Sequence, residues 1–275
     1  MISNLMMKGI YFKKRGEIRM AKLFDLTGKT AVAIGGNGVL GSAMAKGLAE
    51  HGARVAIVGR NLEKAEAVVK EINDNGGEAK AFQADVSSRD SLIKAADEID
   101  QWSGGCDILL NAPGTNSSTP FLELEMDEYD KIMEINLKGI VLACQIFAKR
   151  MIEQDRKGSI INISSVSSTT PLSRVFTYSV SKAGLNSVTQ YLAREFAPNG
   201  IRVNAIIPGF FPAEQNRKIL DAERIENIMR HTPMNRFGEA EELQGATVWL
   251  ASDKASSFVT GAMIRVDGGF GSMTI

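Results

Sequence analysis

Short apolar runs alternate with helical segments along most of this 275-residue chain, and this alternation restricts the fold more than any other feature. Most of the runs are apolar throughout, which is typical of parallel strands buried on both faces. The predicted strands are residues 30–34, 54–58, 79–83, 107–110, 159–163 and 202–207. The predicted helices are residues 42–51, 62–73, 87–99, 126–154 and 178–196, with another from about 239. Right-handed strand–helix–strand units then predict an α/β fold. It is a Rossmann-type doubly wound parallel sheet of about seven strands, with helices on both faces.

One connection is too long for this scheme. Residues 209–237 separate the last predicted strand from the helix at about 239, and residues 213–230 read as a polar helix. Insertions of this length in compact domains are usually lids or binding segments. We therefore expect a helical lid insertion at about 209–237, within a single domain that spans residues 20–275.

The composition excludes several classes of function. Lys plus Arg and Asp plus Glu number 32 each, so no charge excess indicates a nucleic-acid partner. No apolar run approaches the roughly 18 residues of a membrane span. Cys106 and Cys144 are expected to be buried thiols in a reducing compartment, and the scattered His and Cys residues predict no metal site. We expect a cytoplasmic protein that contacts neither nucleic acid nor membrane.

The first 19 residues differ from the rest. Their charged side chains are Lys8, Lys13, Lys14, Arg15, Glu17 and Arg19. They contain no signal-peptide core, and periodic sequence begins only near Leu23. We interpret residues 1–19 either as a non-native extension before a true start at Met20, or as a disordered basic arm.

A glycine cluster follows the first predicted strand. The turn consists of Gly35, Gly36, Asn37, Gly38, Val39, Leu40 and Gly41. Glycines let the backbone turn sharply and approach a pyrophosphate, which binds amides at the start of the next helix. The alternative is a merely flexible turn, but the position after the first strand favours a dinucleotide.

The end of the second predicted strand bears on the choice of cofactor. Gly59, Arg60 and Asn61 stand where an acidic residue would hold the ribose diol of NAD. An arginine suits a 2′-phosphate instead, so Arg60 favours NADP(H), with NAD(H) as the alternative. Arg60 as a solvated loop cation is the competing interpretation. Asn61 is assigned to the same cofactor site.

Tyr178 and Lys182 are four residues apart near the start of a predicted helix, so both lie on one helical face. An ammonium beside a phenol favours phenolate, and we expect the pKa of Tyr178 to fall below its usual value of about 10. A tyrosine of that kind can exchange a proton near neutral pH. Taken alone, such a pair is in most cases a surface feature of an amphipathic helix.

Together these motifs resemble the short-chain dehydrogenase/reductase family over nearly all of residues 23–272. The matching residues are Gly35, Gly41, Asp85, Asn111, Ala112, Pro113, Gly114, Asn136, Ser165, Tyr178, Lys182, Pro208, Gly209, Val266, Asp267, Gly268 and Gly269. Three residues depart from the family pattern. Ile34 replaces a threonine, Val39 stands at the usual middle glycine, and Ala213 replaces a threonine that contacts the nicotinamide amide. A shifted loop in which Gly38 serves as the middle glycine is the alternative.

The resemblance implies a catalytic set of Ser165, Tyr178, Lys182 and Asn136. Tyr178 exchanges the proton on the substrate oxygen, while Lys182 lowers its pKa and holds the nicotinamide ribose. Ser165 orients the carbonyl, with Ser164 as the competing serine, and Asn136 holds a water that links Lys182 to solvent. Further cofactor contacts are implied for Asp85, Val86, Asn111, Ala112, Gly114, Pro208, Gly209 and Phe211. The family also implies a homotetramer that pairs through the helices of Asn136 and Tyr178.

Within the family, the chain is most similar to sugar-acid oxidoreductases of the D-mannonate/D-fructuronate and gluconate 5-dehydrogenase kind. The expected substrate is a small sugar acid, whose carboxylate needs a cationic partner. Arg174 is the best candidate, and the other expected substrate-binding residues are Asn116, Gln215, Asn216 and Arg217. For each of these, an exposed polar residue is an equally good interpretation.

Two other functions compete with this one. A 3-oxoacyl carrier-protein reductase would use an apolar channel, which Phe210 and Phe211 could line. A non-catalytic nucleotide-binding redox sensor would need no proton relay, so the set of Ser165, Tyr178 and Lys182 argues against it.

Overall fold

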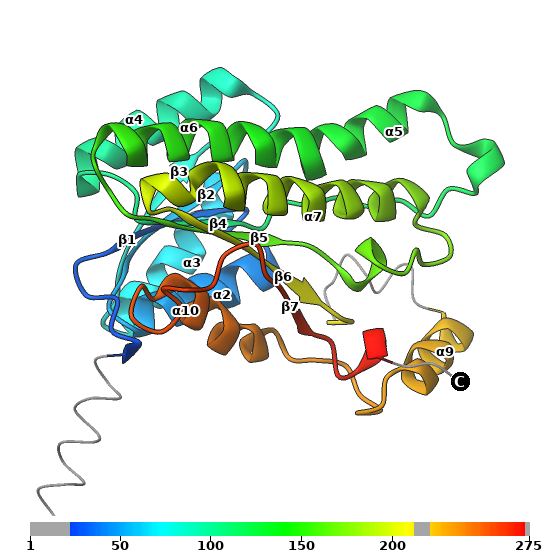
Figure 1. Cartoon of the computed structure of the whole chain (residues 1–275). Helices are drawn as coiled ribbons and strands as arrows, with labels where there is room; N and C mark the ends of the chain where they lie inside the picture. The colour runs from blue at the N-terminus through cyan, green and yellow to red at the C-terminus, as the bar shows by residue number, and fades with distance from the viewer. Residues whose placement is uncertain (1–22, 212–220, 273–275) are drawn as a thin grey trace, which may run out of the picture.

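The computed structural model describes residues 23–211 and 221–272. The predicted extension at residues 1–19 lies outside the described residues. Seven parallel strands form one sheet in the order β3-β2-β1-β4-β5-β6-β7, which confirms the predicted doubly wound architecture (Figure 1). The strands are β1 Thr30–Ile34, β2 Arg54–Gly59, β3 Glu78–Gln83, β4 Ile108–Asn111, β5 Ser159–Ile163, β6 Arg202–Pro208 and β7 Met263–Val266.

The order of the strands positions the site. Chain order reverses between β1 and β4, which pair in parallel with Ile34 opposite Asn111. Loops that leave the carboxyl ends of β1 and β4 therefore diverge to opposite sides and leave a crevice, where doubly wound folds bind their ligands. The glycine turn follows β1, and the Asn111–Gly114 loop follows β4, so both predicted motifs meet at this point.

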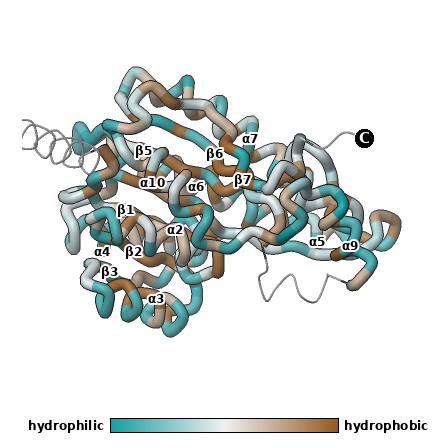
Figure 2. Tube along the Cα trace, turned by 90° about the horizontal axis from the view of Figure 1, so that it is seen from below, coloured by the Kyte–Doolittle hydropathy of each residue, from teal (hydrophilic) through white to brown (hydrophobic). Residues whose placement is uncertain are grey.

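Helices cover both faces of the sheet (Figure 1). They are α2 Val39–Glu50, α3 Leu62–Asp74, α4 Arg89–Ser103, α5 Met126–Met133, α6 Gly139–Glu153, α7 Phe176–Phe196, α9 Ala222–His231 and α10 Gln244–Ala251. One apolar core packs α4, α6 and α7 on one face, and a second packs α2, α3 and α10 on the other. Figure 2 shows the strands as a largely hydrophobic centre between more hydrophilic outer turns. None of the helices in the described residues is long and apolar enough to cross a membrane.

The long helix predicted at 126–154 is interrupted. α5 and α6 are joined by a π-helical segment, Glu134–Lys138, which was not predicted. A π segment widens the helix by one residue and re-aims the side chains in it, and such segments often occur at functional sites. Asn136 lies in its middle and is fully buried.

The insertion after β6 contains the expected helix over its described part, where α9 begins at Ala222. The two ends of the insertion are tied together, because Gly238 N–H donates to the Phe210 carbonyl at 3.0 Å. A Cβ on Gly238 would lie 2.4 Å from the Phe211 ring, so glycine is required for this contact. Phe211 is thus a buried residue of the second core, 6% exposed.

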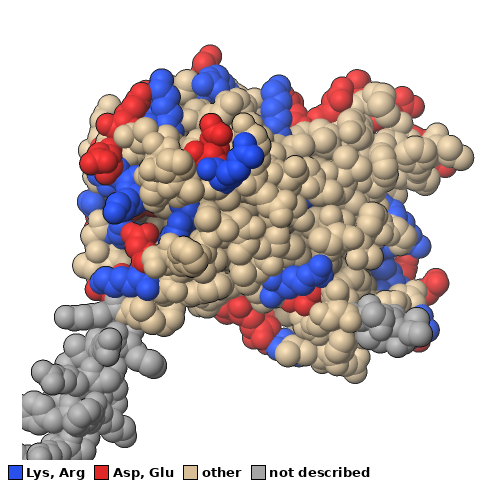
Figure 3. Space-filling model, in the orientation of Figure 1, with Lys and Arg blue, Asp and Glu red and all other residues tan. Residues whose placement is uncertain are grey.

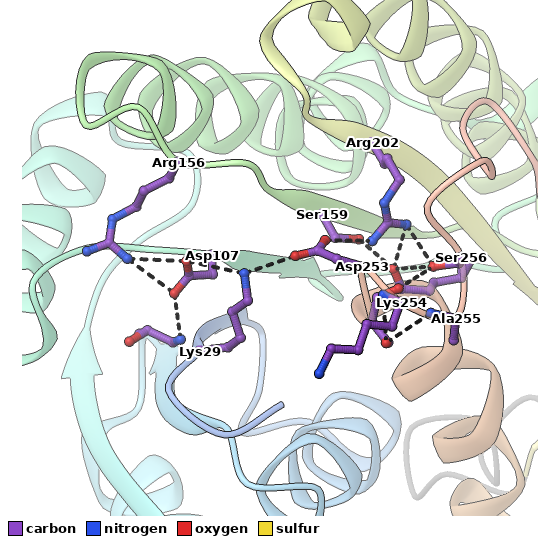
Figure 4. Close-up of polar contacts among 12 residues, drawn as sticks. Lys29, Asp107, Arg156, Ser159, Arg202, Asp253, Lys254, Ala255 and Ser256 are labelled. Atoms are coloured by element: carbon purple, nitrogen blue, oxygen red, sulfur yellow. Dashed lines mark hydrogen bonds and ion pairs between the residues drawn. The ribbon is translucent and has the colours of Figure 1, made fainter. Parts of the chain in front are cut away.

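The opposite, amino edge of the sheet is held by an ionic cluster (Figure 4). The Asp107 carboxylate accepts from the Thr30 amide at 2.9 Å and from Arg156 at 3.2 Å, with Lys29 Nζ at 3.9 Å. Lys29 also donates to Asp253 at 2.9 Å. The cluster joins β1, β4 and β5 at the edge remote from the crevice, which assigns it a structural function.

Candidate active site

The glycine turn packs tightly at the mouth of the crevice. Gly35 has φ +74°, and a Cβ there would lie 2.8 Å from Pro113 N. A Cβ on Gly41 would lie 2.3 Å from the Gly35 carbonyl oxygen. Both positions therefore require glycine. At Gly35 the positive φ and the close packing each exclude a side chain, and at Gly41 the close packing does. The turn brings the backbone of the β1–α2 connection against that of the β4 loop.

Helix α2 begins at Val39 with Gly38 as N-cap, and no side chain caps it. No acidic residue lies in its first turn. The first amides of α2 have no hydrogen-bond partner among the described residues, and with the positive end of the helix dipole they lie at the carboxyl end of β1, as an anion such as a pyrophosphate needs. Val39 is 46% exposed, so the side chain at the usual middle-glycine position is accommodated at the surface.

The Asn37 side chain bridges the glycine turn and the end of β2. Its Nδ2 donates to the Asn61 carbonyl at 3.2 Å, and a Cβ on Gly59 would lie 2.5 Å from it. Beyond lies a cavity of about 540 Å³ whose lining includes Arg60, Asp85 and Lys94. The lining carries the carboxylates of Asp85 and Glu98 as well as the two cations, so its charges balance, and an anionic group of a nucleotide would have to bind beside Arg60 or Lys94.

Three of the four predicted catalytic residues, Ser165, Tyr178 and Lys182, lie near the carboxyl end of β5. Ser165 lies just beyond the end of the strand, and its side chain lowers the pKa of the Tyr178 phenol. Lys182 Nζ donates to the Ile163 carbonyl at 2.8 Å and lies 5.7 Å from the centre of the Tyr178 ring. Ser164 points elsewhere, because its Oγ donates to Asn186 Oδ1 at 2.7 Å. Strand alternation therefore places Ser165, not Ser164, beside the tyrosine.

The expected direction of the Tyr178 pKa shift was wrong for the protein by itself. Burial raises the pKa of Tyr178, and the hydrogen bond with Ser165 only partly opposes that rise. Burial also lowers the pKa of Lys182 to about 8, and its ammonium donates to Ile163 rather than to the phenol. Desolvation of both groups thus outweighs their mutual attraction.

Asn136 holds the β4 loop. Its Oδ1 accepts from the Thr115 amide at 2.8 Å, and its Nδ2 donates to the Thr115 carbonyl at 2.9 Å and to Ser181 Oγ at 3.2 Å. These bonds cross from the π segment to the loop and to α7, so Asn136 is not simply satisfied within its own helix. The loop after Gly114 is thereby fixed relative to the helix of Tyr178.

Three residues assigned to the cofactor have side chains that point into the protein. Asn111 is fully buried and donates to Asn162 Oδ1 at 2.9 Å. Val86 is 8% exposed and packs on Gly139, where a Cβ would lie 2.8 Å from it. Phe211 belongs to the second core. These three side chains pack in the protein interior below the crevice. The sequence alone did not show whether each residue would meet the cofactor through its backbone or through its side chain.

Four of the remaining predicted residues lie at the carboxyl ends of β4 and β6. Ala112 and Gly114 are in the β4 loop, Pro208 ends β6, and Gly209 follows it, where a Cβ would lie 2.7 Å from Asp267. Exposed Asn116 accepts from the neighbouring Ser117 amide at 2.8 Å. Leu40 is partly buried in the first turn of α2. Gln215, Asn216, Arg217 and Ala213 lie outside the described residues.

Arg174 lies on the segment between Ser165 and Tyr178 but already has a carboxylate partner. Its Nη1 donates to Asp221 Oδ2 at 3.0 Å, and both side chains are 51% exposed. Arg224 of α9 donates to the Ser173 carbonyl at 3.0 Å. Two guanidinium groups and one carboxylate therefore join the lid helix to the catalytic segment.

Sequence reasoning missed Asn186, although its spacing could have indicated it. Tyr178, Lys182 and Asn186 recur every four residues and form one stripe of α7. Asn186 Nδ2 donates to Ser168 Oγ at 2.8 Å, and its Oδ1 accepts from Ser164. The helix that carries the tyrosine thus also anchors the serine turn. Arg224 and Asp221 carried no sequence signal, because their partners are about 50 residues away.

Comparisons with known proteins find relatives that match almost the whole chain. The family model described as enoyl-(acyl carrier protein) reductase matches residues 36–271. An uncharacterized oxidoreductase UxuB of Bacillus subtilis is 43% identical over 267 residues, covering 90% of this chain and 96% of the relative.

Two solved structures share the whole architecture. A gluconate 5-dehydrogenase from Burkholderia cenocepacia, in complex with NADP and tartrate, has a TM-score of 0.88 at 34% identity. It is matched over 93% of this chain and all of that chain. A Haemophilus influenzae protein with bound NAD, provisionally described as a D-mannonate oxidoreductase, has a TM-score of 0.87 at 37% identity. It is matched over 93% of this chain and 99% of that chain.

Proposed function

The chain belongs to the short-chain dehydrogenase/reductase family, whose members oxidise or reduce CH–OH groups with NAD(P), and we propose that its substrate is a sugar acid. D-mannonate/D-fructuronate and gluconate/5-ketogluconate are the leading pairs. The observation that carries the reaction type is the contact between Ser165 and Tyr178 beside buried Lys182.

Tyr178 is the group that gives or takes the proton on the substrate oxygen. Ser165 donates a hydrogen bond to that oxygen and fixes its angle, an orienting and electrostatic contribution. Lys182 places a positive charge beside the phenol and, when the cofactor is bound, holds its nicotinamide ribose. The bound nicotinamide supplies or accepts the hydride. Asn136 keeps the β4 loop in position through Thr115.

The glycine turn, the start of α2 and the cavity near Arg60 would hold the dinucleotide. Arg60 follows β2 and lines that cavity together with Lys94, Asp85 and Glu98, and a guanidinium at this position suits a 2′-phosphate better than a free ribose diol. We therefore favour NADP(H) over NAD(H). Relatives of known structure bind one or the other.

Arg174 is the proposed anchor for the substrate carboxylate. It is close in sequence to Tyr178, and it already binds a carboxylate, that of Asp221. An exposed ion pair of this kind contributes about 1 kcal/mol or less, so a substrate carboxylate with further contacts can displace Asp221.

We also propose that the protein is a homotetramer in the cytoplasm. Between α6 and α7 lies an apolar groove of about 380 Å³, lined by residues that include Val141, Val188 and Tyr191. The middle of the face in Figure 3 is largely uncharged. A second copy of the same helix pair would cover this groove. The free, buried thiols of Cys106 and Cys144 suit a reducing compartment.

A steady-state screen tests the substrate class. Sugar acids, the corresponding alditols and an acetoacetyl thioester would each be tried with NADP(H) and NAD(H). We expect the highest kcat/KM for a sugar acid with NADP(H). A higher kcat/KM for the thioester would establish the carrier-protein reductase instead. Tight NADPH binding without turnover of any compound would support the redox sensor.

A further inference from the structure

The hydroxyl of Ser165 has an unusual environment, because a second buried serine points both of its donors at it. Ser167 N–H donates to Ser165 Oγ at 3.2 Å, and Ser167 Oγ lies 3.1 Å from the same atom. Ser167 is 1% exposed, and its hydroxyl has no other hydrogen-bond partner within the described part of the chain. The contact is therefore sheltered from water, and nothing competes for the Ser167 hydroxyl.

The number of hydrogen bonds that a hydroxyl can form determines whether Ser165 donates or accepts in each of its bonds. A serine hydroxyl has one proton to donate and two lone pairs that accept. When Tyr178 is ionised, its oxygen can only accept, so Ser165 must donate its single proton toward it. The two lone pairs of Ser165 Oγ then receive the N–H and the O–H of Ser167.

We propose that Ser167 is a positioning residue that makes Ser165 a hydrogen-bond donor only, directed at the oxygen of Tyr178 in the protein by itself and at the substrate oxygen once substrate is bound. This inference rests on the proposed roles of Tyr178 and Ser165 but not on the identity of the sugar acid. Ser167 itself touches neither substrate nor cofactor. It acts by donating to both lone pairs of Ser165 Oγ. The Ser165 O–H can then point only away from Ser167, toward the site.

The rest of the turn supports this function. Ser168 Oγ donates to the Ser165 carbonyl at 2.6 Å and accepts from Asn186 Nδ2 at 2.8 Å. Asn186 also accepts from Ser164 at 2.7 Å. The backbone on both sides of Ser165 is thus fixed to α7, and the hydroxyl of Ser167 adds the remaining restraint on the side chain.

Replacing Ser167 by alanine tests the proposal. The variant keeps the backbone N–H but loses the hydroxyl donor, so one lone pair of Ser165 becomes free and its proton is no longer directed. We expect kcat to fall roughly 3- to 10-fold, the factor associated with one neutral hydrogen bond, with little change in KM. Threonine at this position retains a hydroxyl and should restore most of kcat.

A titration of tyrosinate absorbance provides a readout that does not depend on turnover. The difference between the protein and its Tyr178→Phe variant isolates Tyr178. Because donation from Ser165 lowers the pKa of Tyr178, weaker donation in Ser167→Ala should raise the midpoint. The acid limb of the pH profile for alcohol oxidation should move to higher pH by the same amount.

Ser179→Ala is the matched control. Ser179 is a buried serine beside Tyr178 whose hydroxyl donates only to the Val175 carbonyl at 2.9 Å. It should leave both the midpoint and kcat unchanged. The proposal is overturned if Ser167→Ala leaves the Tyr178 midpoint where it was, whatever happens to kcat. Full activity of Tyr178→Phe would instead refute the proposed reaction, so the two failures are distinguishable.

Discussion

At the scale of single residues, the pKa values of Tyr178 and Lys182 depend on how far burial removes each side chain from water. Tyr178 and Lys182 lie on one face of α7, but both are desolvated, so burial raises the pKa of the phenol and lowers that of the ammonium. In the protein by itself the tyrosine is therefore not preset as a phenolate. Bound cofactor and substrate would have to supply the remaining stabilisation of the ionised form.

Tyr178→Phe removes the proton donor and little else. We expect turnover to fall by about three orders of magnitude, consistent with the loss of a general acid–base. The melting temperature and NADPH affinity should stay close to those of the parent protein. Turnover within tenfold of the parent would show that another group carries the proton.

The buried Lys182 ammonium makes the free energy of unfolding depend on pH. Burial lowers its pKa from the ordinary 10.5 to about 8. Between these values the unfolded chain holds the proton and the folded chain has released it, so the free energy of unfolding rises with pH in this window. We expect a rise of roughly 2 kcal/mol between about pH 8 and pH 10, at 1.36 kcal/mol per pKa unit. Urea titration of the cofactor-free protein measures it.

Two variants separate this effect from other alkaline titrations. In Lys182→Met the rise should disappear. Lys131→Met, which replaces an exposed lysine of α5, should retain it. Equal pH dependence in both variants would contradict the assignment to Lys182.

At the scale of elements, the two edges of the sheet have different functions. The carboxyl edge carries the loops of the crevice, which are held by hydrogen bonds to α7 and by exposed contacts such as the Arg174–Asp221 pair. The amino edge is fixed by charged side chains from several strands (Figure 4). This separation lets the loops of the crevice vary without weakening the sheet, and it allows stability and activity to be tested independently.

Asp107→Asn should destabilise the protein with little effect on kcat. The carboxylate is 10% exposed and is shared by Thr30, Arg156 and Lys29, and its loss removes the ion pair of Arg156. We expect a loss of about 2–3 kcal/mol in the free energy of unfolding, measured from the urea midpoint. Asp74→Asn, in an exposed pair with Lys70, should cost less than about 0.5 kcal/mol. Similar losses in both variants would contradict a structural function for the cluster.

Replacing Asp221 and replacing Arg174 should change the KM for a sugar acid in opposite directions. Asp221→Asn frees Arg174 while asparagine still caps α9, so KM for a sugar acid should fall roughly 2- to 5-fold. Arg174→Ala should raise that KM about tenfold or more, through loss of a charge-assisted contact. KM for the uncharged alditol should not change in either variant, and Arg194→Ala on the distal part of α7 should alter neither. An unchanged KM for the sugar acid in Arg174→Ala would exclude Arg174 as the anchor.

At the scale of the whole molecule, the uncovered groove between α6 and α7 predicts self-association. Val188→Glu places a charge in this groove, and we expect the tetramer to dissociate, as measured by light scattering coupled to size exclusion. Lys64→Glu on α3, which covers the other face of the sheet, should leave the assembly unchanged. A monomeric parent protein at micromolar concentration would refute the tetramer.

The sequence alone was enough for the fold and for the reaction class. Apolar runs that need cover on both faces admit few architectures besides a doubly wound sheet. The six strands with predicted ranges and most helices lie within a few residues of those ranges, whereas β7 had no predicted range. The four-residue spacing of Tyr178 and Lys182 on a helix fixes their common face whatever surrounds them. Gly35 and Gly41 likewise indicate close backbone approach, because a strand-to-helix turn this short leaves no room for side chains at either position.

Only the tertiary structure decided what depends on neighbours distant in the chain. It showed that Ser165 rather than Ser164 faces Tyr178, that Asn111, Val86 and Phe211 point into the core, and that Arg174 pairs with Asp221. It also reversed the predicted shift of the Tyr178 pKa. Burial, like hydrogen bonding across loops, is set by packing between segments that are far apart in sequence, and no local pattern of residue types encodes it.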